Sequence, residues 1–187
     1  MKVSREQMAE NRVRILNAST HLFRDRGFDA VTVSEVMKAA GLTHGGFYGH
    51  FASKDDLIAR AVAHALTATN GEGGDLGAWM DAYLSPHHRD SAATGCPNAA
   101  LAGLLHNQSP EARAAMTEGQ RIQIERLTGA IPAEGSLADD AERRTAAIGS
   151  WAAMVGAVIL SRAISDPDLS DEVLASTRRW IDQAMPD

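Results

Sequence analysis

The chain has 187 residues, of which 44% are hydrophobic and 22% charged, and its formal net charge at pH 7 is -6. A chain of this length can bury one helical core or two smaller ones. Its single cysteine excludes an intramolecular disulfide, which agrees with a reducing compartment. Neither a run of 18 apolar residues nor the apolar core of a signal peptide is present, so we expect a cytoplasmic protein with no membrane partner.

The charge is unevenly distributed along the chain. Residues 1–70 carry nine Lys or Arg and seven Asp or Glu, a balance of +2, whereas residues 71–187 carry nine against seventeen, a balance of -8. An anionic partner would therefore be bound by the N-terminal part of the chain.

Two helices joined by a sharp turn are predicted near the N-terminus, after a long first helix over residues 5–26 that ends at Gly27. The next helix, over residues 32–39, has apolar residues at spacings of three and four, which gives it one buried face. Gly41 can take the left-handed conformation that a corner between two helices requires. The apolar residues of that face are Val33, Val36, Met37 and Ala40.

The helix after the turn is predicted to be short, from Thr43 to near His50, with Phe47 and Phe51 as its anchors in the core. Its remaining residues offer small donors, a phenol, two imidazoles and bare backbone. These features allow close approach to a surface and suit a DNA major groove. The exposed set is Thr43, His44, Gly45, Gly46, Tyr48, Gly49 and His50.

A further helix is expected to start at Ser53, with Asp56 reaching back toward the start in the manner of a capping box. Lys54 places a cation in the first turn, against the helix dipole, at a cost of about 0.3 to 1 kcal/mol. A docked anion explains this lysine, and a phosphate is suited to the free N–H groups of a helix start.

The stretch from about residue 12 to residue 58, with its pattern T-x-x-x-F-Y-x-H-F-x-S-K-x-x-L, resembles the DNA-binding domain of the TetR family of bacterial transcriptional regulators. The resemblance implies an all-α homodimer, usually a repressor, that binds a palindromic operator. It also implies a C-terminal helical part that binds a small molecule and dimerises. Phosphates would be held by Thr32, Thr43, Tyr48, His50 and Lys54, and the bases would lie nearest His44, Gly45 and Gly46.

The sequence departs from that pattern in having three glycines, at 45, 46 and 49, where one is usual. Each additional glycine in a helix costs about 0.5 to 1 kcal/mol relative to alanine. Sequence readout by side chains would therefore depend mainly on Thr43 and His44.

The remaining sequence is also predicted to be helical, which gives an all-α fold of two domains. Residues 1–52 would form the helix-turn-helix domain, and residues 53–187 the ligand-binding and dimerisation domain, with a helix from 53 to about 69 connecting them. The glycine-rich segment 70–74 would follow that helix. Later helices are expected over 76–84, from Pro97, from Ser109 to about Gly129, over 137–164 and from Ser170, with a long loop from Ser85.

A small-molecule effector would bind among the aromatic and methionine residues of the otherwise alanine-rich C-terminal part, which suit an apolar pocket with a few polar groups. The proposed pocket residues are Trp79, Met80, Tyr83, Cys96, Leu101, Leu104, Leu105, Met116, Trp151 and Met154. The same residues could equally form a core.

The last two predicted helices carry more apolar surface than one body of this size needs. The family places its dimer interface there as a four-helix bundle. We expect the following residues to divide between the core of the subunit and this interface: Trp151, Val155, Val158, Ile159, Leu174, Trp180 and Ile181.

Three other functions are considered. Cys96 precedes a predicted helix start at Pro97, where the dipole favours a thiolate, so a thiol that senses electrophiles or oxidants is one alternative. A helical scaffold that has lost specific DNA binding is another, because of the three glycines.

An enzyme is not expected, because the sequence lacks a phosphate-binding glycine loop and a G-x-S-x-G motif. No metal site or cofactor is expected either, since adjacent His87 and His88 seldom converge on one ion.

Overall fold

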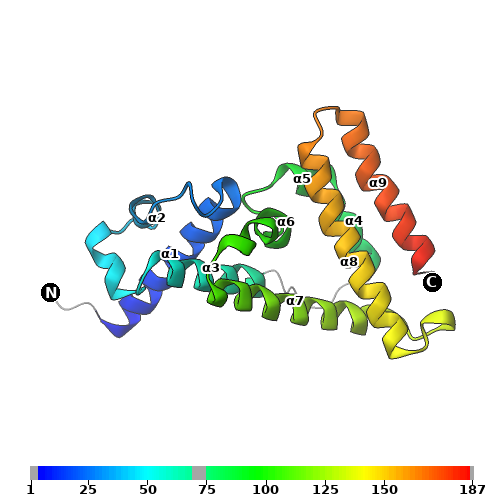
Figure 1. Cartoon of the computed structure of the whole chain (residues 1–187), viewed down its shortest axis with the longest axis horizontal. Helices are drawn as coiled ribbons and strands as arrows, with labels where there is room; N and C mark the ends of the chain where they lie inside the picture. The colour runs from blue at the N-terminus through cyan, green and yellow to red at the C-terminus, as the bar shows by residue number, and fades with distance from the viewer. Residues whose placement is uncertain (1–3, 69–74, 186–187) are drawn as a thin grey trace. The chain divides into compact units, whose positions relative to one another are not determined.

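The computed structural model of the chain describes residues 4–68 and 75–185 (Figure 1). Throughout these ranges the regular secondary structure is helical, which confirms the predicted all-α fold. The chain packs as two compact units. Unit 1 consists of residues 1–70 and 100–119, and unit 2 of residues 71–99 and 120–187. The predicted division at residue 52 is a different, functional boundary and stays a prediction.

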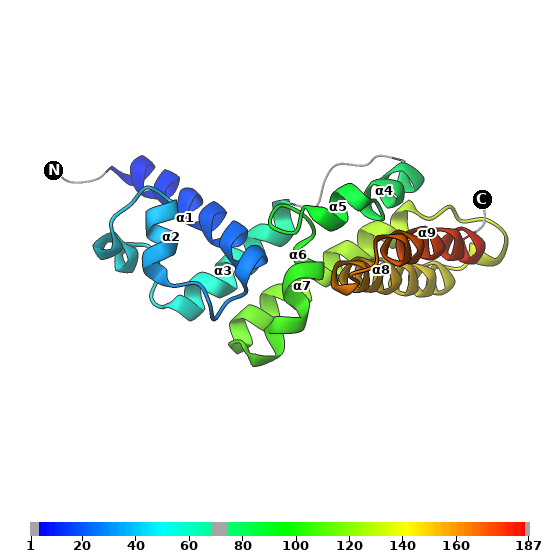
Figure 2. The ribbon, with the colours of Figure 1, turned by 90° about the horizontal axis from the view of Figure 1, so that it is seen from above.

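Unit 1 begins with α1 (Arg5–Arg26), α2 (Val33–Ala39), the 3-10 helix η1 (His44–Gly49) and α3 (Lys54–Ala68) (Figure 2). The 3-10 helix η2 (Ala102–Asn107) and the first part of α7 (Pro110–Ala130) also belong to this unit. A short helix follows the turn where the sequence predicts one, and it has 3-10 geometry. Three glycines among its six residues reduce the intrinsic preference for an α-helix.

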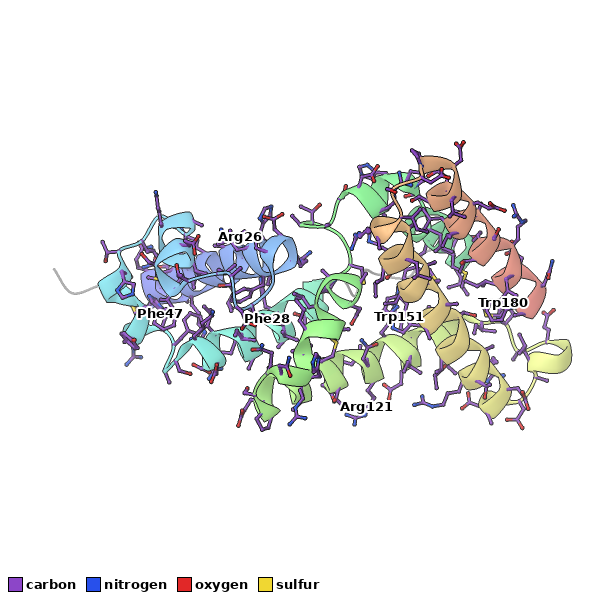
Figure 3. The ribbon with its side chains drawn as sticks, turned by 45° about the horizontal axis from the view of Figure 1, so that its top comes forward. Arg26, Phe28, Phe47, Arg121, Trp151 and Trp180 are labelled. Atoms are coloured by element: carbon purple, nitrogen blue, oxygen red, sulfur yellow. The ribbon has the colours of Figure 1, made fainter. Side chains whose placement is uncertain are left out.

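The ends of α1 and α2 are fixed as the sequence predicts. Gly27 caps α1 with a φ of 76°, and its N–H donates to the carbonyl of Phe23. Gly41, with a φ of 68°, makes the corner after α2, which confirms its predicted role. Arg26, at the end of α1, donates to Glu35 of α2 at 2.9 Å (Figure 3).

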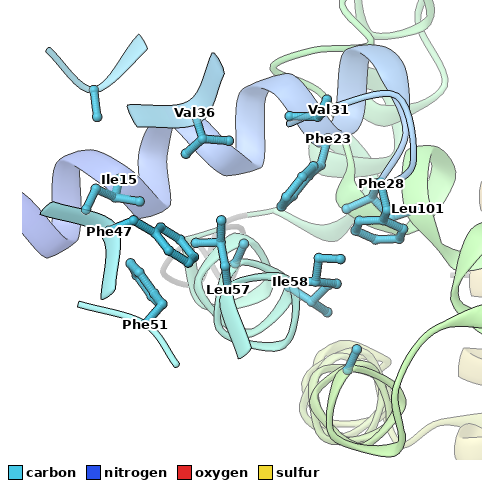
Figure 4. Close-up of a cluster of buried hydrophobic side chains, with 14 of the residues drawn as sticks. Ile15, Phe23, Phe28, Val31, Val36, Phe47, Phe51, Leu57, Ile58 and Leu101 are labelled. Carbon is cyan, nitrogen blue, oxygen red and sulfur yellow. The ribbon is translucent and has the colours of Figure 1, made fainter. Parts of the chain in front are cut away.

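The core of unit 1 gathers side chains from α1, α2, η1 and α3 around four phenylalanines (Figure 4). The rings of Phe23 and Phe28 meet edge to face with centroids 5.3 Å apart, and those of Phe47 and Phe51 stack at 5.8 Å. Phe47 and Phe51 are almost completely buried, as predicted. They hold the short η1 to the rest of the unit, because burying a large aromatic ring contributes about 1.5 to 3 kcal/mol.

Unit 2 contains α4 (Leu76–Tyr83), α5 (Pro86–Asp90), most of α6 (Pro97–Leu101), the second part of α7, the 3-10 helix η3 (Gly135–Leu137), α8 (Asp140–Ala163) and α9 (Pro167–Ala184). The last two helices pack along each other (Figure 2). A second hydrophobic cluster forms between them and α4, and includes Met80, Trp151, Met154, Leu174 and Ile181.

Several predicted boundaries in unit 2 were wrong. The segment after Ser85 is the short helix α5 and not a loop, because Pro86 occupies its first turn and the Ser85 hydroxyl accepts from the N–H of His88. The last helix is capped by Asp166 and not by Ser170. Ser170 is buried inside α9, where its hydroxyl donates to the carbonyl of Ser161 at 2.8 Å. The predicted glycine-rich segment 70–74 lies outside the described residues.

One described helix, α8, is long and apolar enough by length and composition alone to cross a membrane, although the sequence has no run of 18 apolar residues. This is weak evidence for a membrane span, because the core helix of a soluble protein meets the same criteria. Trp151, Met154 and Val158 of α8 are buried in the hydrophobic cluster of unit 2.

Candidate nucleic-acid interface

The start of α2 is held by a complete capping box between Thr32 and Glu35. The Thr32 hydroxyl accepts from the N–H of Glu35 at 3.2 Å, and the Glu35 carboxylate accepts from the N–H of Thr32 at 2.8 Å. The Thr32 hydroxyl also donates to that carboxylate at 2.7 Å. These hydrogen bonds from Thr32, assisted by Arg26, lower the pKa of Glu35 to about 2. A phosphate at Thr32 would have to compete with Glu35 for the hydroxyl proton.

The outer face of η1 carries most of the residues predicted to meet DNA. Phe47 points into the core, whereas Tyr48 is 72% exposed, with its ring edge against that of Phe47 at 5.2 Å. The other predicted contact residues of this segment, Thr43, His44, Gly45 and Gly46, are also exposed. One phenol and a strip of small residues therefore face solvent from a helix anchored by buried rings.

The three glycines of η1 are not required by the packing of the folded chain. A Cβ atom added at Gly45 would meet nothing within 4 Å. At Gly46 and Gly49 the nearest atoms would lie 3.7 and 3.9 Å away, which are ordinary van der Waals contacts. None of the three has a positive φ. Their lack of side chains is therefore better explained by something that approaches the helix from outside.

His50 lies at the C-terminal end of η1 and is half-buried. Its carbonyl accepts a hydrogen bond from the Arg12 guanidinium, which also lies 4.5 Å from the centre of the Phe51 ring. Burial lowers the pKa of His50, and the charge of Arg12 lowers it further. The imidazole is therefore neutral at pH 7, so it would offer a phosphate a single N–H donor.

Lys54 occupies the first turn of α3, as predicted, between the Ser53 cap and two aspartates. The Ser53 hydroxyl accepts from the N–H of Asp56 at 3.1 Å. The Asp56 carboxylate, however, accepts from the N–H of Ala52 at 3.0 Å, one residue earlier than a capping box requires. Of the two hydrogen bonds of the predicted capping box, the one accepted by the Ser53 hydroxyl is present and the one from the Ser53 N–H to Asp56 is replaced by that from Ala52. The Lys54 cation lies in the first turn of the helix, as predicted.

Two arginines of α1 support this surface, and no sequence motif predicts their role. Arg12 bonds the carbonyl of His50, and Arg14 donates to the carbonyl of Ala40 at 2.5 Å, next to the Gly41 corner. Arg14 thereby stabilises the start of the turn at Ala40, and Arg12 stabilises the end of η1 at His50. No local spacing in the sequence signals these contacts, because the paired residues are 38 and 26 positions apart.

The predicted effector residues fall into two hydrophobic clusters. Those in unit 2 surround Trp79, Tyr83 and Trp151, whose ring centroids are 5.4 to 6.1 Å apart. Those in unit 1 are Leu101, Leu105 and Met116, while Leu104 is largely exposed, contrary to the inward position predicted for it. The unit 2 members of the predicted set are Trp79, Met80, Tyr83, Cys96, Trp151 and Met154.

The polar residues around the unit 2 cluster also lacked a sequence signal. The indole of Trp151 bonds Gln120, and the Arg126 guanidinium lies over the Trp79 ring. Gln123 is buried on the same helix. Polar residues on a helix are ordinarily assigned to its solvent face, so the sequence alone gave no reason to place these in the interior.

The predicted dimer residues are likewise divided by burial. Trp151, Val158, Leu174 and Ile181 are buried within unit 2, and Val155 is partly buried. Ile159 and Trp180 are exposed, and Leu160 beside them is exposed as well. An apolar groove between α8 and α9 includes Ala153, Gly156, Leu160, Val173 and Trp180 in its lining.

The described residues contain no group of three or more His, Cys, Asp or Glu that could hold a metal ion.

These features define an all-helical protein with an N-terminal helix-turn-helix and a helical body. The sequence profile of bacterial regulatory proteins of the tetR family matches residues 15–61. This part of the chain is similar to the TetR family, whose members are transcriptional regulators and not enzymes.

Individual relatives agree with this assignment. A transcriptional repressor of Mycobacterium tuberculosis, Rv1474c, is 31% identical over 96 residues, which are 50% of this chain and 51% of that protein. The repressor AcnR of Corynebacterium jeikeium is 36% identical over 63 residues, 34% of this chain and 33% of that one. The chain thus spans about half the length of the first relative and a third of the second.

The fold extends over the whole chain in solved structures. The reduced form of NemR from E. coli superposes with a TM-score of 0.73 at 22% identity, covering 92% of this chain and 95% of that one. A TetR-family regulator from Cytophaga hutchinsonii gives a TM-score of 0.73 at 18% identity and covers 100% of both chains. At these identities the likeness concerns the fold alone.

Proposed function

We propose that this chain is a repressor that binds double-stranded operator DNA as a homodimer and is released by a small-molecule effector. The observation that carries the DNA-binding part is the outer face of η1. Buried Phe47 and Phe51 fix this face, and three glycines that the fold does not need leave its backbone bare. A major groove accepts such a surface, because short side chains and backbone can reach the base edges.

The phosphate contacts in this proposal come from both ends of η1. Tyr48 projects from it with an exposed phenol, Thr43 precedes it, and Lys54 follows at the start of α3. Half to two-thirds of the hydrogen bonds in protein–DNA complexes go to the backbone, so these residues would set the position of the helix. Thr32 and the neutral His50 would contribute weaker, uncharged contacts.

The experiment that tests DNA binding is selection of bound sequences from random duplex DNA by the purified full chain, followed by titration of the selected site at several salt concentrations. A palindrome and a steep fall of affinity with salt support the proposal, since neutralised phosphates release counterions. If no sequence is enriched and any binding is insensitive to salt, the scaffold alternative is favoured.

The homodimer would form through α8 and α9. These helices leave Ile159, Leu160 and Trp180 exposed beside an apolar groove, and such a patch is uncommon on a monomer. The buried residues of the predicted set would support this face from within. Two recognition helices would then meet successive major grooves about 34 to 36 Å apart. Sedimentation equilibrium of the parent and of a Trp180→Glu variant tests this, with dissociation expected for the variant.

Release by an effector requires that the ligand bind more tightly to the state that does not fit the operator. The unit 2 cluster around Trp79, Tyr83 and Trp151 is the favoured site, because its rings lie within 6.1 Å of one another and polar groups surround them. A bacterial DNA-binding regulator must reach the chromosome, which lies in the cytoplasm, so we propose a cytoplasmic location for this protein.

Thiol sensing through Cys96 stays a second prediction. The thiol accepts a hydrogen bond from the side-chain amide of Asn98 at 3.6 Å, and the N–H of Cys96 donates to Nε2 of His88 at 2.9 Å. The residue is only 7% exposed, however, which opposes rapid reaction with an electrophile.

A further inference from the structure

Unsatisfied donors are concentrated in the interior of unit 2. Among the residues that the structure describes, the buried side-chain nitrogen atoms without a hydrogen-bond partner are Nε2 of Gln123 and Nε and Nη2 of Arg126, while the buried Tyr83 hydroxyl meets no nitrogen or oxygen partner and interacts with the Cys96 thiol. Tyr83 is 8% exposed and Gln123 is 7% exposed. Buried polar groups normally have partners, because an unpaired donor retains its full desolvation cost. A group of such donors therefore indicates a ligand that accepts hydrogen bonds.

These donors lie around one aromatic cluster. The Arg126 guanidinium carbon is 4.8 Å from the centre of the Trp79 ring, and Trp79 lies 5.6 Å from Tyr83 and 6.1 Å from Trp151. Gln120, Gln123 and Arg126 follow one another at intervals of three along α7, so they share one face of that helix. Gln120 accepts from the indole of Trp151 at 2.9 Å, which fixes that face against the cluster.

The charge at this site is positive and uncompensated. Burial lowers the pKa of Arg126, and no carboxylate of the described residues contributes to it. Two other arginines of unit 2 are paired with carboxylates, Arg178 with Asp81 and Arg143 with Asp140. Arg162, which influences the pKa of Tyr83, donates to the backbone carbonyls of Arg89 and His88. A cationic ligand would be repelled here, although aromatic rings alone would suit one.

The unpaired atoms of Arg126 have a particular geometry. Nε and Nη2 form one edge of the guanidinium plane, and this edge donates two parallel hydrogen bonds to the two oxygens of a carboxylate. A carboxylate accepts and does not donate, so it satisfies these donors without leaving a proton of its own unpaired.

We propose that the effector of this protein is a planar organic anion, bound with its carboxylate on Arg126 and Gln123 and its apolar ring against Trp79 and Trp151. The Tyr83 hydroxyl would donate to a second acceptor on the ligand. This inference rests on the proposed function in one respect only, namely that the ligand of this site is the effector.

The test uses the full chain and two pairs of probes, benzoate with benzamide and 1-naphthoate with 1-naphthamide, measured by isothermal titration calorimetry. Each pair has the same ring and differs in charge. A carboxylate is expected to bind at least about tenfold more tightly than its amide. The Arg126→Gln variant should lose the preference for the carboxylate. The Arg126→Lys variant keeps the positive charge but should lose most of the preference, because an ammonium cannot donate the two parallel hydrogen bonds of a guanidinium. The exposed Arg144→Gln serves as the matched control and should bind as the parent does.

Each of three results would overturn the inference. These are failure of both carboxylates to bind, equal affinity for the acid and the amide of a pair, and an unchanged preference for the carboxylate in Arg126→Gln. Thermal melting without ligand separates a binding role from a structural one. An unpaired buried charge opposes folding, so Arg126→Gln should melt no lower than the parent. A large loss of stability in both Arg126 variants would instead identify a structural anchor and would also overturn the inference.

Operator binding, measured in parallel, distinguishes failure of this inference from failure of the proposed function. Salt-dependent operator binding without carboxylate binding overturns the anion site and leaves the DNA-binding proposal intact. Carboxylate binding that depends on Arg126, in a chain that enriches no DNA sequence, supports the site and overturns its role as an effector site.

Discussion

The indole Nε1 of Trp151 donates a hydrogen bond to Oε1 of Gln120, 2.9 Å away. Gln120 in turn donates to the side chain of Asn98, whose amide donates to the sulfur of Cys96 at 3.6 Å. This series of bonds connects α8, α7 and the segment around the start of α6 inside unit 2. A buried network of this kind stabilises one arrangement only when all its members are paired.

Replacing Trp151 with phenylalanine should destabilise unit 2. The substitution removes the indole donor to Gln120, which costs about 1 to 3 kcal/mol, and the smaller ring leaves a gap. Urea unfolding followed by circular dichroism measures the free energy of unfolding. Tyr48→Phe in unit 1 is the control, since Tyr48 is 72% exposed and lies outside the proposed dimer interface, and without DNA it should change the value by less than about 0.5 kcal/mol. Equal effects at both positions would contradict the role given to the network.

Glu35 should make the stability of unit 1 dependent on pH. Because its pKa is lowered from 4.5 to about 2 in the folded chain, its charged form is stabilised by folding. This contribution is complete above about pH 4.5 and disappears as the pH falls through about 2. Glu35→Gln should therefore melt at a lower temperature than the parent at pH 7, and the difference should shrink as the pH falls below 4.5. The exposed Glu134→Gln should show no such convergence.

Cys96 should react slowly in the folded protein, because its side chain is buried. Iodoacetamide labelling, followed by mass spectrometry with and without urea, measures the protection. We expect modification in native buffer to be at least about tenfold slower than in urea, where the thiol behaves as an ordinary cysteine. A native rate as fast as that of free cysteine would favour the thiol-sensing alternative over release by a non-covalent effector.

Much of unit 1 could be predicted because its signals are local. Apolar spacing gives the buried face of α2, a glycine marks each of the two corners at 27 and 41, and serine or threonine caps precede the helices. The pattern around Phe47 and Tyr48 then indicated the resemblance to the TetR family, which the match over residues 15–61 supports. What the sequence could not give was the tertiary support of this site, such as the bond from Arg12 to His50, because it joins distant positions.

Unit 2 was predicted less well, for a physical reason. Apolar residues on its helices are buried whether they form a core, a pocket or an interface, so periodicity does not separate these uses. Burial in the folded chain separates Trp151 and Ile181, which face inward, from Ile159 and Trp180, which do not. The buried Gln123 and the half-buried Arg126 carry no sequence signal, since such residues are usually exposed.

Lys54 and Tyr48 should affect DNA binding in different ways. Lys54→Gln removes a phosphate charge and should reduce the slope of log affinity against log salt by about 1. Tyr48→Phe removes a neutral donor, so it should weaken binding about tenfold at each salt concentration without changing the slope. Fluorescence anisotropy with the selected operator measures both quantities. A parent-like affinity for Tyr48→Phe at every salt concentration would exclude its hydroxyl from the phosphate contacts.

Gly45→Ala should separate the needs of the fold from the needs of DNA binding. The added methyl group meets nothing within 4 Å in the free chain and Gly45 has no positive φ, so stability should stay the same or rise by up to about 1 kcal/mol. The same group would stand between η1 and the base edges, and operator affinity should fall. Gly129→Ala in α7 is the matched control, since a Cβ there also meets open space. It should give a similar change in thermal stability with operator affinity unchanged. If Gly45→Ala bound operator as tightly as Gly129→Ala does, the bare backbone of η1 would not be the surface that approaches DNA.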